Sequence, residues 1–317
     1  MPASEAGVSA SPHARIAVVV LNYRTPDLVR DCIDSLRSEI DPERDVVVIV
    51  DNASGDDSVA RLRRLVKEHP ELPLRLLSAA ENAGFAAGNN LAIESVAAEA
   101  YLLLNSDTLV QPDALSALFQ ALEANPGVGL VSPRLEWPDG SPQTSCFRLH
   151  TPWSELLAGA RTDAVRRLLA DYEVALPAPR LHDEPQWVSF AAALIRAKSL
   201  RDIGGLDPGF FMYYEDADAC RRLRAMGWRL LYEPRARVVH LRGGSSPVKR
   251  LTALGKRRPR YYYQSRARFF RRAYGRWGLF AANLLWTLGR AIAWLRETFG
   301  GKAPHTVRAE LRDLWRG

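Results

Sequence analysis

The sequence contains few cysteines and no apolar leader. Its 317 residues include three cysteines, Cys32, Cys146 and Cys220. Their odd number and scattered positions exclude a disulfide framework and a cysteine zinc site, which is typical of a reducing cytoplasm. Cys32 lies on the apolar face of a predicted helix, so we expect it in the core. Residues 1–14 are small and polar and lack the apolar stretch of a signal peptide, so we expect a disordered lead there.

Two common phosphate-binding signatures are also absent. No phosphate loop of the Walker type occurs, and Gly84 and Gly88 do not have the spacing of the dinucleotide-binding fingerprint. The chain is long enough for one large α/β domain and an extension, and its 47% hydrophobic content is ordinary for a globular enzyme.

Acidic residues are missing from one long stretch near the C-terminus, residues 249–296. Residues 249–317 hold 17 Lys and Arg against 3 Asp and Glu, a net charge of +14. Residues 1–248 hold 26 against 33, a net charge of −7. The sequence therefore predicts an acidic body, residues 15–248, and a basic extension, residues 249–317. The charge of the extension indicates what it contacts in the cell.

What is present begins with the pattern of an α/β sheet. Residues 16–23 form an almost continuous β-branched run, too short to span a membrane and typical of a strand buried on both faces. Residues 46–50 form a second such run, and apolar residues at helical spacing lie between the two. This order predicts a doubly wound sheet, in which ligands bind beyond the carboxyl ends of the strands. Asp51 would face that pocket, or would cap a helix predicted over residues 58–66.

Two further segments place polar groups near the ends of predicted elements. Residues 82–90 contain two glycines and three asparagines before a helix-compatible stretch, as in a loop where the backbone approaches a polar ligand. Residues 101–108 predict a buried strand that delivers Asn105 and Asp107 from one face. Hard oxygen ligands at this spacing indicate Mg²⁺ or Mn²⁺ rather than zinc.

The most informative segment is residues 204–220, where Glu215, Asp216 and Asp218 follow an aromatic run. Carboxylates beside apolar rings have a raised pKa and cost free energy unless a cation or a catalytic task compensates. That arrangement suits a general base facing a sugar hydroxyl. The alternative is a helix N-terminus, where acidic residues are favoured by the dipole.

Together these segments resemble the family-2 glycosyltransferases of the GT-A fold, in particular the bacterial rhamnosyltransferase-like branch. The resemblance covers residues 16–246, and the four motifs occur in the expected order. It implies an α/β GT-A fold, that is, a doubly wound, mixed, mostly parallel sheet with a helical C-terminal extension.

The resemblance also assigns roles to individual residues. It implies that the nucleotide base is held by four residues near the first two strands: Asn22, Tyr23, Asp51 and Asn52. It implies that Asp51 accepts a hydrogen bond from uracil or thymine. It implies that the nucleoside and diphosphate pocket is lined from residues 82–90, and we select Asn82, Gly84, Phe85 and Asn89.

The metal and the acceptor base follow from the same resemblance. Residues 105–107 match the family's Asp-x-Asp metal motif, but Asn105 stands in the first position, so we assign the metal chiefly to Asp107 and group Asn105 and Ser106 with the donor site. Asp216 matches the base, with Glu215 orienting it or contacting the acceptor. His240 matches a histidine that completes the metal shell in some relatives; the alternative is a hydrogen-bonded structural histidine.

The implied reaction is a single inverting displacement assisted by Mn²⁺ or Mg²⁺. The donor is a dTDP- or UDP-sugar, with rhamnose as the first candidate. The acceptor hydroxyl belongs to a cell-wall or surface-polysaccharide saccharide, in some cases carried on a polyprenyl diphosphate. We expect residues 137–187, which are rich in Pro and Arg, to carry a loop that meets the acceptor.

The C-terminal extension has three competing interpretations. Residues 277–295 show apolar residues over roughly five helical turns, with Asn283, Thr287 and Arg290 on one side. A membrane span needs about 20 apolar residues, and Arg290 would cost about 2.5–3.5 kcal/mol there. A helix on an anionic membrane surface fits better, and packing on the catalytic domain is the third interpretation. The surface helix predicts a peripheral protein at the cytoplasmic face of the cell membrane.

Other functions remain as alternatives. A nucleotidyltransferase that makes nucleotide sugars normally has a basic glycine-rich loop after the first strand, where this chain has residues 22–27 instead. A catalytically inactive, membrane-bound scaffold would not need Asp107, Asp216 and His240. Nucleic acid is not expected as a partner, because the body is acidic and the basic tail continues into a wide apolar helix.

Overall fold

A computed structural model describes residues 13–176, 184–242, 247–300 and 307–317. Most of the lead expected at residues 1–14 therefore lies outside the described residues, as do the residues 243–246 that follow the His240 segment. Ala14, which we had assigned to the lead, is instead the first residue of strand β1.

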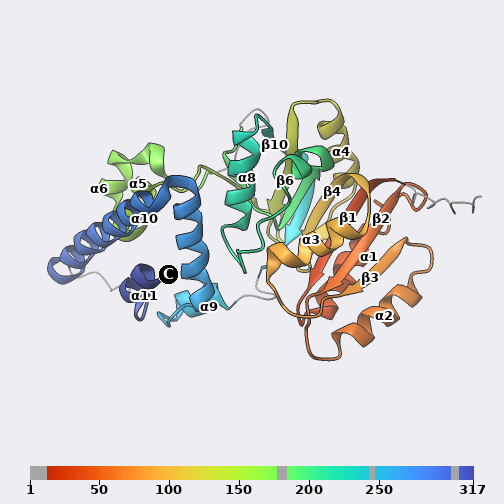
Figure 1. The fold of residues 1–317 in the computed structure, drawn as a ribbon, viewed down its shortest axis with the longest axis horizontal. Coiled ribbons are helices and arrows are strands. Elements are labelled where there is room, and N and C mark those ends of the chain that lie inside the picture. The colour runs from red at the N-terminus through yellow and green to blue at the C-terminus, as the bar shows by residue number, and fades with distance from the viewer. Residues whose placement is uncertain (1–12, 177–183, 243–246, 301–306) are drawn as a thin grey trace, which may run out of the picture.

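An eight-stranded mixed sheet forms one end of the molecule (Figure 1). Its strand order is β3-β2-β1-β4-β9-β6-β10-β5. The first four strands in this order are parallel; β9 is antiparallel to both its neighbours, and β5 is antiparallel to β10. The strands are β1 (Ala14–Asn22), β2 (Asp45–Asp51), β3 (Leu74–Ser78), β4 (Ala98–Asn105), β5 (Thr108–Val110), β6 (Val128–Glu136), β9 (Ala192–Arg196) and β10 (Arg229–His240).

Helices cover both faces of the sheet, which explains the continuous apolar runs. Alternate residues of β1 enter different cores: Ile16 and Val18 lie in one, Ala17 and Val19 in the other. The first core is closed by α1 (Pro26–Leu36), α2 (Ser58–Glu68) and α4 (Ala114–Glu123). The second is closed by α3 (Phe85–Ser95), α7 (Ala197–Asp202) and α8 (Glu215–Ala225). The predicted doubly wound sheet is confirmed, and Cys32 is fully buried in the first core.

Two local expectations were wrong in detail. The segment expected as a loop over residues 82–90 becomes helix α3 at Phe85, since the run of small residues after it is helix-compatible. The strand expected to continue to residue 108 ends at Asn105, and Ser106 and Asp107 form a turn before β5. The relative directions of the Asn105 and Asp107 side chains are therefore set by this turn and not by the alternation of a strand.

The segment between β6 and β9 does more than form a loop. It contains a small hairpin, β7 (Cys146–Phe147) with β8 (Trp187–Val188), and helices α5 (Pro152–Ala160) and α6 (Asp163–Leu168), followed by a short 3₁₀ turn, Ala170–Tyr172. Helix α5 crosses the C-terminal helix α10 (Arg260–Phe299) closely: a Cβ on Gly159 would lie 2.3 Å from the carbonyl oxygen of Trp286. Gly289 makes the reciprocal approach to Leu156.

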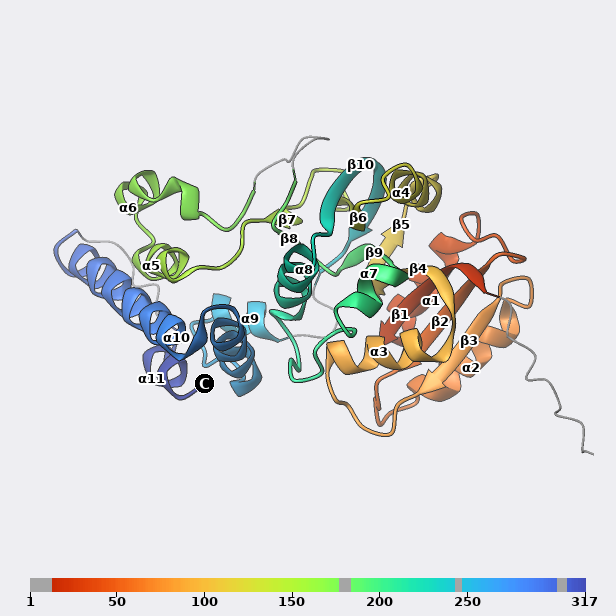
Figure 2. The same ribbon diagram turned by 45° about the horizontal axis from the view of Figure 1, so that its top comes forward.

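The extension is helical, as expected, and consists of α9 (Val248–Ala253), α10 and α11 (Glu310–Arg316). Figures 1 and 2 show α10 and α11 beside α5 at the end of the molecule away from the sheet, with α8 between. Gly275 interrupts α10 with φ 71° and ψ −173°, so the element is two helices joined at a kink. Among the described residues, α10 is the one helix long and apolar enough to cross a membrane, and a third of its most apolar stretch is buried.

The second half of α10 has two different faces. One face packs against the protein through Leu279, Ala282, Trp286 and Ala293. Arg290, which we had treated as a charge opposing insertion, is paired with Glu297 through two hydrogen bonds of 3.1 and 2.6 Å. The interpretation of packing on the protein is thus correct for this face. The other face exposes a row of large apolar side chains: Trp277, Phe280, Leu284, Leu288, Ile292, Leu295 and Phe299.

Candidate active site

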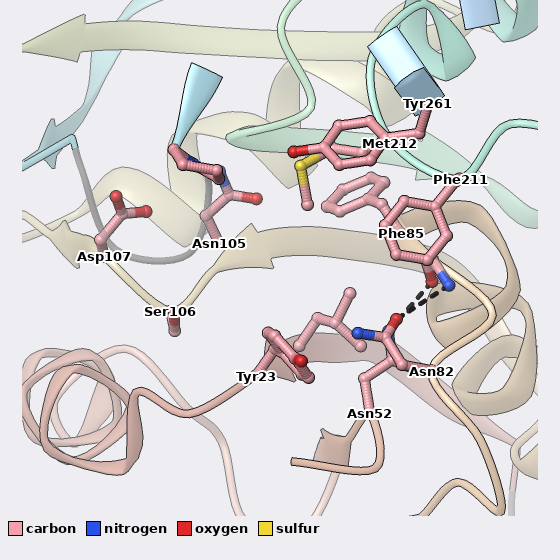
Figure 3. A pocket seen from close by; sticks show the side chains of 13 residues that line it. Tyr23, Asn52, Asn82, Phe85, Asn105, Ser106, Asp107, Phe211, Met212 and Tyr261 are labelled. Atoms are coloured by element: carbon pink, nitrogen blue, oxygen red, sulfur yellow. Dashed lines mark hydrogen bonds between the residues drawn. The ribbon is translucent and has the colours of Figure 1, made fainter. Parts of the chain in front are cut away.

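A cavity of about 250 Å³ lies at the carboxyl ends of β1, β2 and β4. Figure 3 shows Tyr23 and Asn52 on one side of it, Met212 and Tyr261 on the opposite side, and Asn105 and Asp107 towards one end. Seven of the ten residues that we assigned to the donor site line it: Tyr23, Asn52, Asn82, Gly84, Phe85, Asn105 and Ser106. The position agrees with the rule that ligands bind beyond the carboxyl ends of parallel strands.

The Asn82–Phe85 side of this cavity is fixed by close backbone packing. The amide of Asn52 donates to Asn82 Oδ1 and to the Gly84 carbonyl, both at 3.1 Å. Gly84 has φ 94°, and a Cβ there would lie 2.2 Å from the carbonyl oxygen of Phe211. The same oxygen accepts a 2.7 Å hydrogen bond from the Phe85 N–H. Glycine is therefore required at residue 84 for the 211 segment to close this wall.

Three predicted donor residues lie behind the wall instead of on it. Asn22 is fully buried and donates to Asp51 Oδ1 at 2.7 Å. The two oxygens of Asp51 also accept from the hydroxyl and backbone N–H of Ser54. Asn89 lies inside α3 and donates to the Phe85 carbonyl. As placed, Asp51 holds the turn after β2, and its carboxylate does not face the cavity.

A second cavity, of about 660 Å³, adjoins the first. Phe85, Asn105, Asp107, Met212 and Pro247 line both cavities. The second cavity also brings together the remaining predicted catalytic and metal residues: Glu215, Asp216 and His240. Asp107 thus lies on the wall common to the cavity of the predicted donor residues and the cavity that contains Glu215 and Asp216.

Asp107 and His240 are neighbours at the edge of the sheet. His240 is the last residue of β10 and pairs with Thr108 of β5, which places its Nε2 3.5 Å from Asp107 Oδ1. Both side chains are about nine-tenths buried, and His240 Nδ1 has no hydrogen-bond partner among the described residues. The nitrogen that faces Asp107 is Nε2, so a cation shared by the two side chains would bind Nε2 and a carboxylate oxygen.

These two residues fit a divalent metal ion. The described residues contain no group of three or more His, Cys, Asp or Glu side chains that could hold a metal. A carboxylate oxygen and an imidazole nitrogen suit Mn²⁺, and Mg²⁺ needs chiefly the oxygen. Two protein ligands leave most coordination positions to water and substrate oxygens, so a site here would need a ligand such as a diphosphate to be complete.

Glu215 and Asp216 are the first two residues of helix α8, and burial raises the pKa of both carboxyl groups. Burial raises the pKa of Glu215 well above its ordinary value, and the neighbouring charge of Asp216 raises it further. Burial also raises the pKa of Asp216, to about 6, although backbone N–H groups including that of Ala217 favour its charged form. Glu215 Oε2 has no hydrogen-bond partner among the described residues. A carboxylate whose pKa is raised towards neutrality has the property that a general base needs.

Asp218, the third carboxylate of this segment, has a different role. It is fully buried and bound by Arg221 at 3.1 Å, by Arg222 at 2.7 Å and by Arg272 of α10 at 3.3 Å. It holds the helices together and does not line either cavity.

The sequence analysis missed several wall residues. Phe211 and Met212 belong to the aromatic run before Glu215, and the run itself was the available signal. Tyr261 comes from α10, so no local pattern connected it with the first cavity. Arg242 and Arg250 line the second cavity; they follow β10 closely, and no pattern in the sequence marked them as wall residues.

Comparison with known proteins identifies the family. The model of glycosyltransferase-like family 2 matches residues 12–264. The chain belongs to this family. An N-acetylglucosaminyl-diphospho-decaprenol L-rhamnosyltransferase from Mycobacterium tuberculosis is 27% identical over 278 residues, which cover 78% of this chain and 80% of the relative. This glycosyltransferase therefore resembles the rhamnosyltransferase branch, as its motifs predicted.

Solved structures support the GT-A fold of this glycosyltransferase. A mannosyltransferase from Pyrobaculum calidifontis, in complex with GDP-Man and Mn²⁺, superposes with a TM-score of 0.53 at 19% identity, covering 96% of this chain and 84% of that one. GalNAc-T7 with UDP, GalNAc and Mn²⁺ superposes with a TM-score of 0.60 at 14% identity, covering 92% and 55%. At these identities the likeness concerns the fold alone.

Proposed function

We propose that this glycosyltransferase transfers a sugar, with rhamnose as the first candidate, from a dTDP- or UDP-sugar to an acceptor hydroxyl with inversion. The observation that carries the proposal is the junction of the two cavities at Asn105 and Asp107. A donor bound in the first cavity would present its anomeric carbon towards the second, where Asp216 lies. An inverting displacement needs one base on the face opposite the leaving group, and no covalent intermediate.

Each side chain then has a definite task. Tyr23 and Asn52 bind the nucleoside, and Asn105 and Ser106 bind towards the diphosphate. Asp216 removes the acceptor proton, while Glu215 hydrogen-bonds the acceptor or orients it. Asp107 and His240 would hold Mn²⁺ or Mg²⁺, which supplies positive charge for the departing diphosphate. Arg242 contributes fixed positive charge on the same wall.

The acceptor is proposed to be a lipid-linked saccharide of cell-wall or surface-polysaccharide assembly. The mycobacterial relative is named for a diphospho-decaprenol substrate. The apolar row on α10 continues across α11, because Trp315 packs on Phe280 with ring centroids 5.8 Å apart. A continuous exposed apolar surface of this kind suits an anionic lipid interface, which would hold the enzyme at the cytoplasmic face of the membrane near its acceptor.

Calorimetry with dTDP-rhamnose, UDP-galactose and UDP-N-acetylglucosamine, each with Mn²⁺ and with EDTA, tests the donor site. Metal-dependent binding of one donor is expected, followed by transfer to a polyprenyl diphosphate saccharide with an inverted anomeric bond by NMR. The value of kcat/KM should fall about tenfold per pH unit below pH 6, because Asp216, whose pKa is raised to about 6, becomes protonated. Absence of binding by all three sugars and by the free nucleoside diphosphates would contradict the proposed function.

A further inference from the structure

Tyr213 and Tyr214 have left-handed backbone conformations immediately before Glu215 and Asp216. Their φ angles are 72° and 67°. This region is unfavourable for residues other than glycine, and two such residues in succession persist only where the surrounding structure enforces them. The position of the catalytic carboxylates therefore depends on whatever holds these two tyrosines.

The aromatic part of that support comes from the first half of α10. The ring of Tyr262 lies 5.7 Å from that of Tyr213 and 6.2 Å from that of Tyr214, measured between centroids. Phe269, which is fully buried in the adjoining core, lies 5.6 Å from Tyr214 between ring centroids. Tyr262 and Phe269 of α10 thus pack against the rings of Tyr213 and Tyr214, the two residues with left-handed backbone.

Ion pairs from the same half-helix hold the two ends of the segment. Arg268 donates to both oxygens of Asp207, at 2.9 and 2.8 Å. The Nε of Arg272 lies 3.3 Å from Asp207 and 3.3 Å from Asp218. Gly209 makes room for this arrangement, since a Cβ there would lie 2.1 Å from the Arg268 guanidinium carbon. Residues 207–218, which include the catalytic pair, are therefore tied at both ends to α10.

We propose that residues 260–274 of α10 position the catalytic pair, with Arg268 and Arg272 as the positioning residues. They act through Asp207 and Asp218 and touch no substrate. With Tyr262 and Phe269 they hold residues 207–218 in the strained conformation that turns Glu215 and Asp216 towards the second cavity. The proposal deepens the proposed function and rests on it for its kinetic test, but its structural test is independent of turnover.

The test variant is Arg268→Met with Arg272→Met, which keeps the side-chain stems and removes the charges. Folding should survive, because Asp218 keeps Arg221 and Arg222, and Asp207 keeps the Gly209 N–H at 2.9 Å. Arg276→Met is the matched control, since Arg276 is an exposed arginine of the same helix beyond the kink.

Hydrogen–deuterium exchange provides the structural measurement. Amide exchange in residues 207–218 should rise at least severalfold in the double variant and stay unchanged in the Arg276 control. Exchange in α2, which packs on the other face of the sheet, should also stay unchanged. Equal exchange of residues 207–218 in the double variant and the wild type would overturn the proposal.

Steady-state kinetics provides the functional measurement. We expect kcat to fall about tenfold or more, as for a modest displacement of a catalytic group. Calorimetric affinity for the nucleoside diphosphate with Mn²⁺ should fall by a smaller factor, because Phe211 and Met212 of this segment form only part of the wall of the first cavity. Lysine at both positions should restore most of kcat, because it keeps the charges. Unchanged kcat, or a parallel loss of kcat and nucleotide affinity, would refute the positioning role. If the wild type transfers no sugar, the proposed function fails while the exchange result still decides the present proposal.

Discussion

Replacing Asp216 by Asn should stabilise the folded protein while abolishing sugar transfer. Asn has the same shape and keeps an oxygen for the Ala217 N–H, which donates to Asp216 Oδ1 at 2.8 Å. What it removes is a negative charge that burial disfavours, since burial raises the pKa of Asp216 from an ordinary 3.8 to about 6. The folded state thus binds this proton more tightly than the unfolded chain, and ionising Asp216 costs stability.

The size and the pH window of the effect follow from the same pKa difference. The difference between about 6 and 3.8 corresponds to about 3 kcal/mol when Asp216 is fully ionised in both states, above pH 6. Asp216 keeps partial contact with solvent at the cavity wall, so we expect about 1–3 kcal/mol, or a melting temperature roughly 2–6 °C higher at pH 8. The gain should shrink to about a third at pH 4.5 and disappear below the unfolded pKa.

Thermal unfolding of the wild type and Asp216→Asn at pH 8 and pH 4.5 measures this effect. Asp218→Asn is the matched control on the same helix, and it should lower the melting temperature because Asp218 is bound by three arginines. A lower melting temperature for Asp216→Asn at pH 8, or a gain of equal size at both pH values, would refute the reasoning. Undiminished sugar transfer by Asp216→Asn would show that Asp216 is not the base.

Two other predictions concern the metal and the membrane. Asp107→Ala should lower nucleoside diphosphate affinity at least tenfold in Mn²⁺ and leave it unchanged in EDTA, as measured by calorimetry; equal affinities in Mn²⁺ would show that Asp107 holds no metal. Trp277→Glu with Phe280→Glu should release the protein from anionic liposomes in co-sedimentation without changing kcat on a water-soluble acceptor. Leu168→Glu, another exposed apolar position outside the row, is the control, and retained liposome binding by the double variant would exclude this surface.

The sequence predicted those elements whose signals are local. The β-branched runs gave β1 and β2, because a strand covered on both faces must be apolar throughout. Asp107 and Asp216 were selected as site candidates from their positions after an apolar strand and an aromatic run, and His240 was selected through the family resemblance. Their convergence on one cavity could be expected from the family resemblance, and not from spacing alone.

Contacts between distant segments were not predictable in the same way. Asp51 has the right residue type at the right strand end, yet Asn22 and Ser54 use its oxygens and turn it from the cavity. Tyr261 reaches the first cavity only because α10 returns to the body. No periodicity or spacing in the sequence predicts either of these contacts.

The arginines of α10 that pair with acidic residues of the body and the exposed apolar row belong to different halves of this helix, which the sequence pattern alone did not separate. In the first half of α10 three arginines face acidic partners of the body. Arg266 pairs with Glu155 at 2.7 Å, Arg268 with Asp207 at 2.8 Å, and Arg272 with Asp207 at 3.3 Å. Part of the positive charge that we interpreted as a membrane signal is therefore paired within the protein. The exposed apolar row begins at Trp277, just beyond the kink at Gly275.

This division changes how the membrane hypothesis must be tested. Deletion of residues 251–317 is the simplest test of membrane binding. It would also remove Phe269 and Phe270, which are fully buried, and expose Phe210, which packs in the same cluster. Burying side chains of this size contributes roughly 1.5–3 kcal/mol each. A truncated protein would fail to bind liposomes, or bind them through its exposed core, for reasons unrelated to the apolar row. Because the kink separates the half-helix that supports the catalytic segment from the half that presents the row, substitutions beyond Gly275 isolate membrane binding and substitutions before it isolate catalysis.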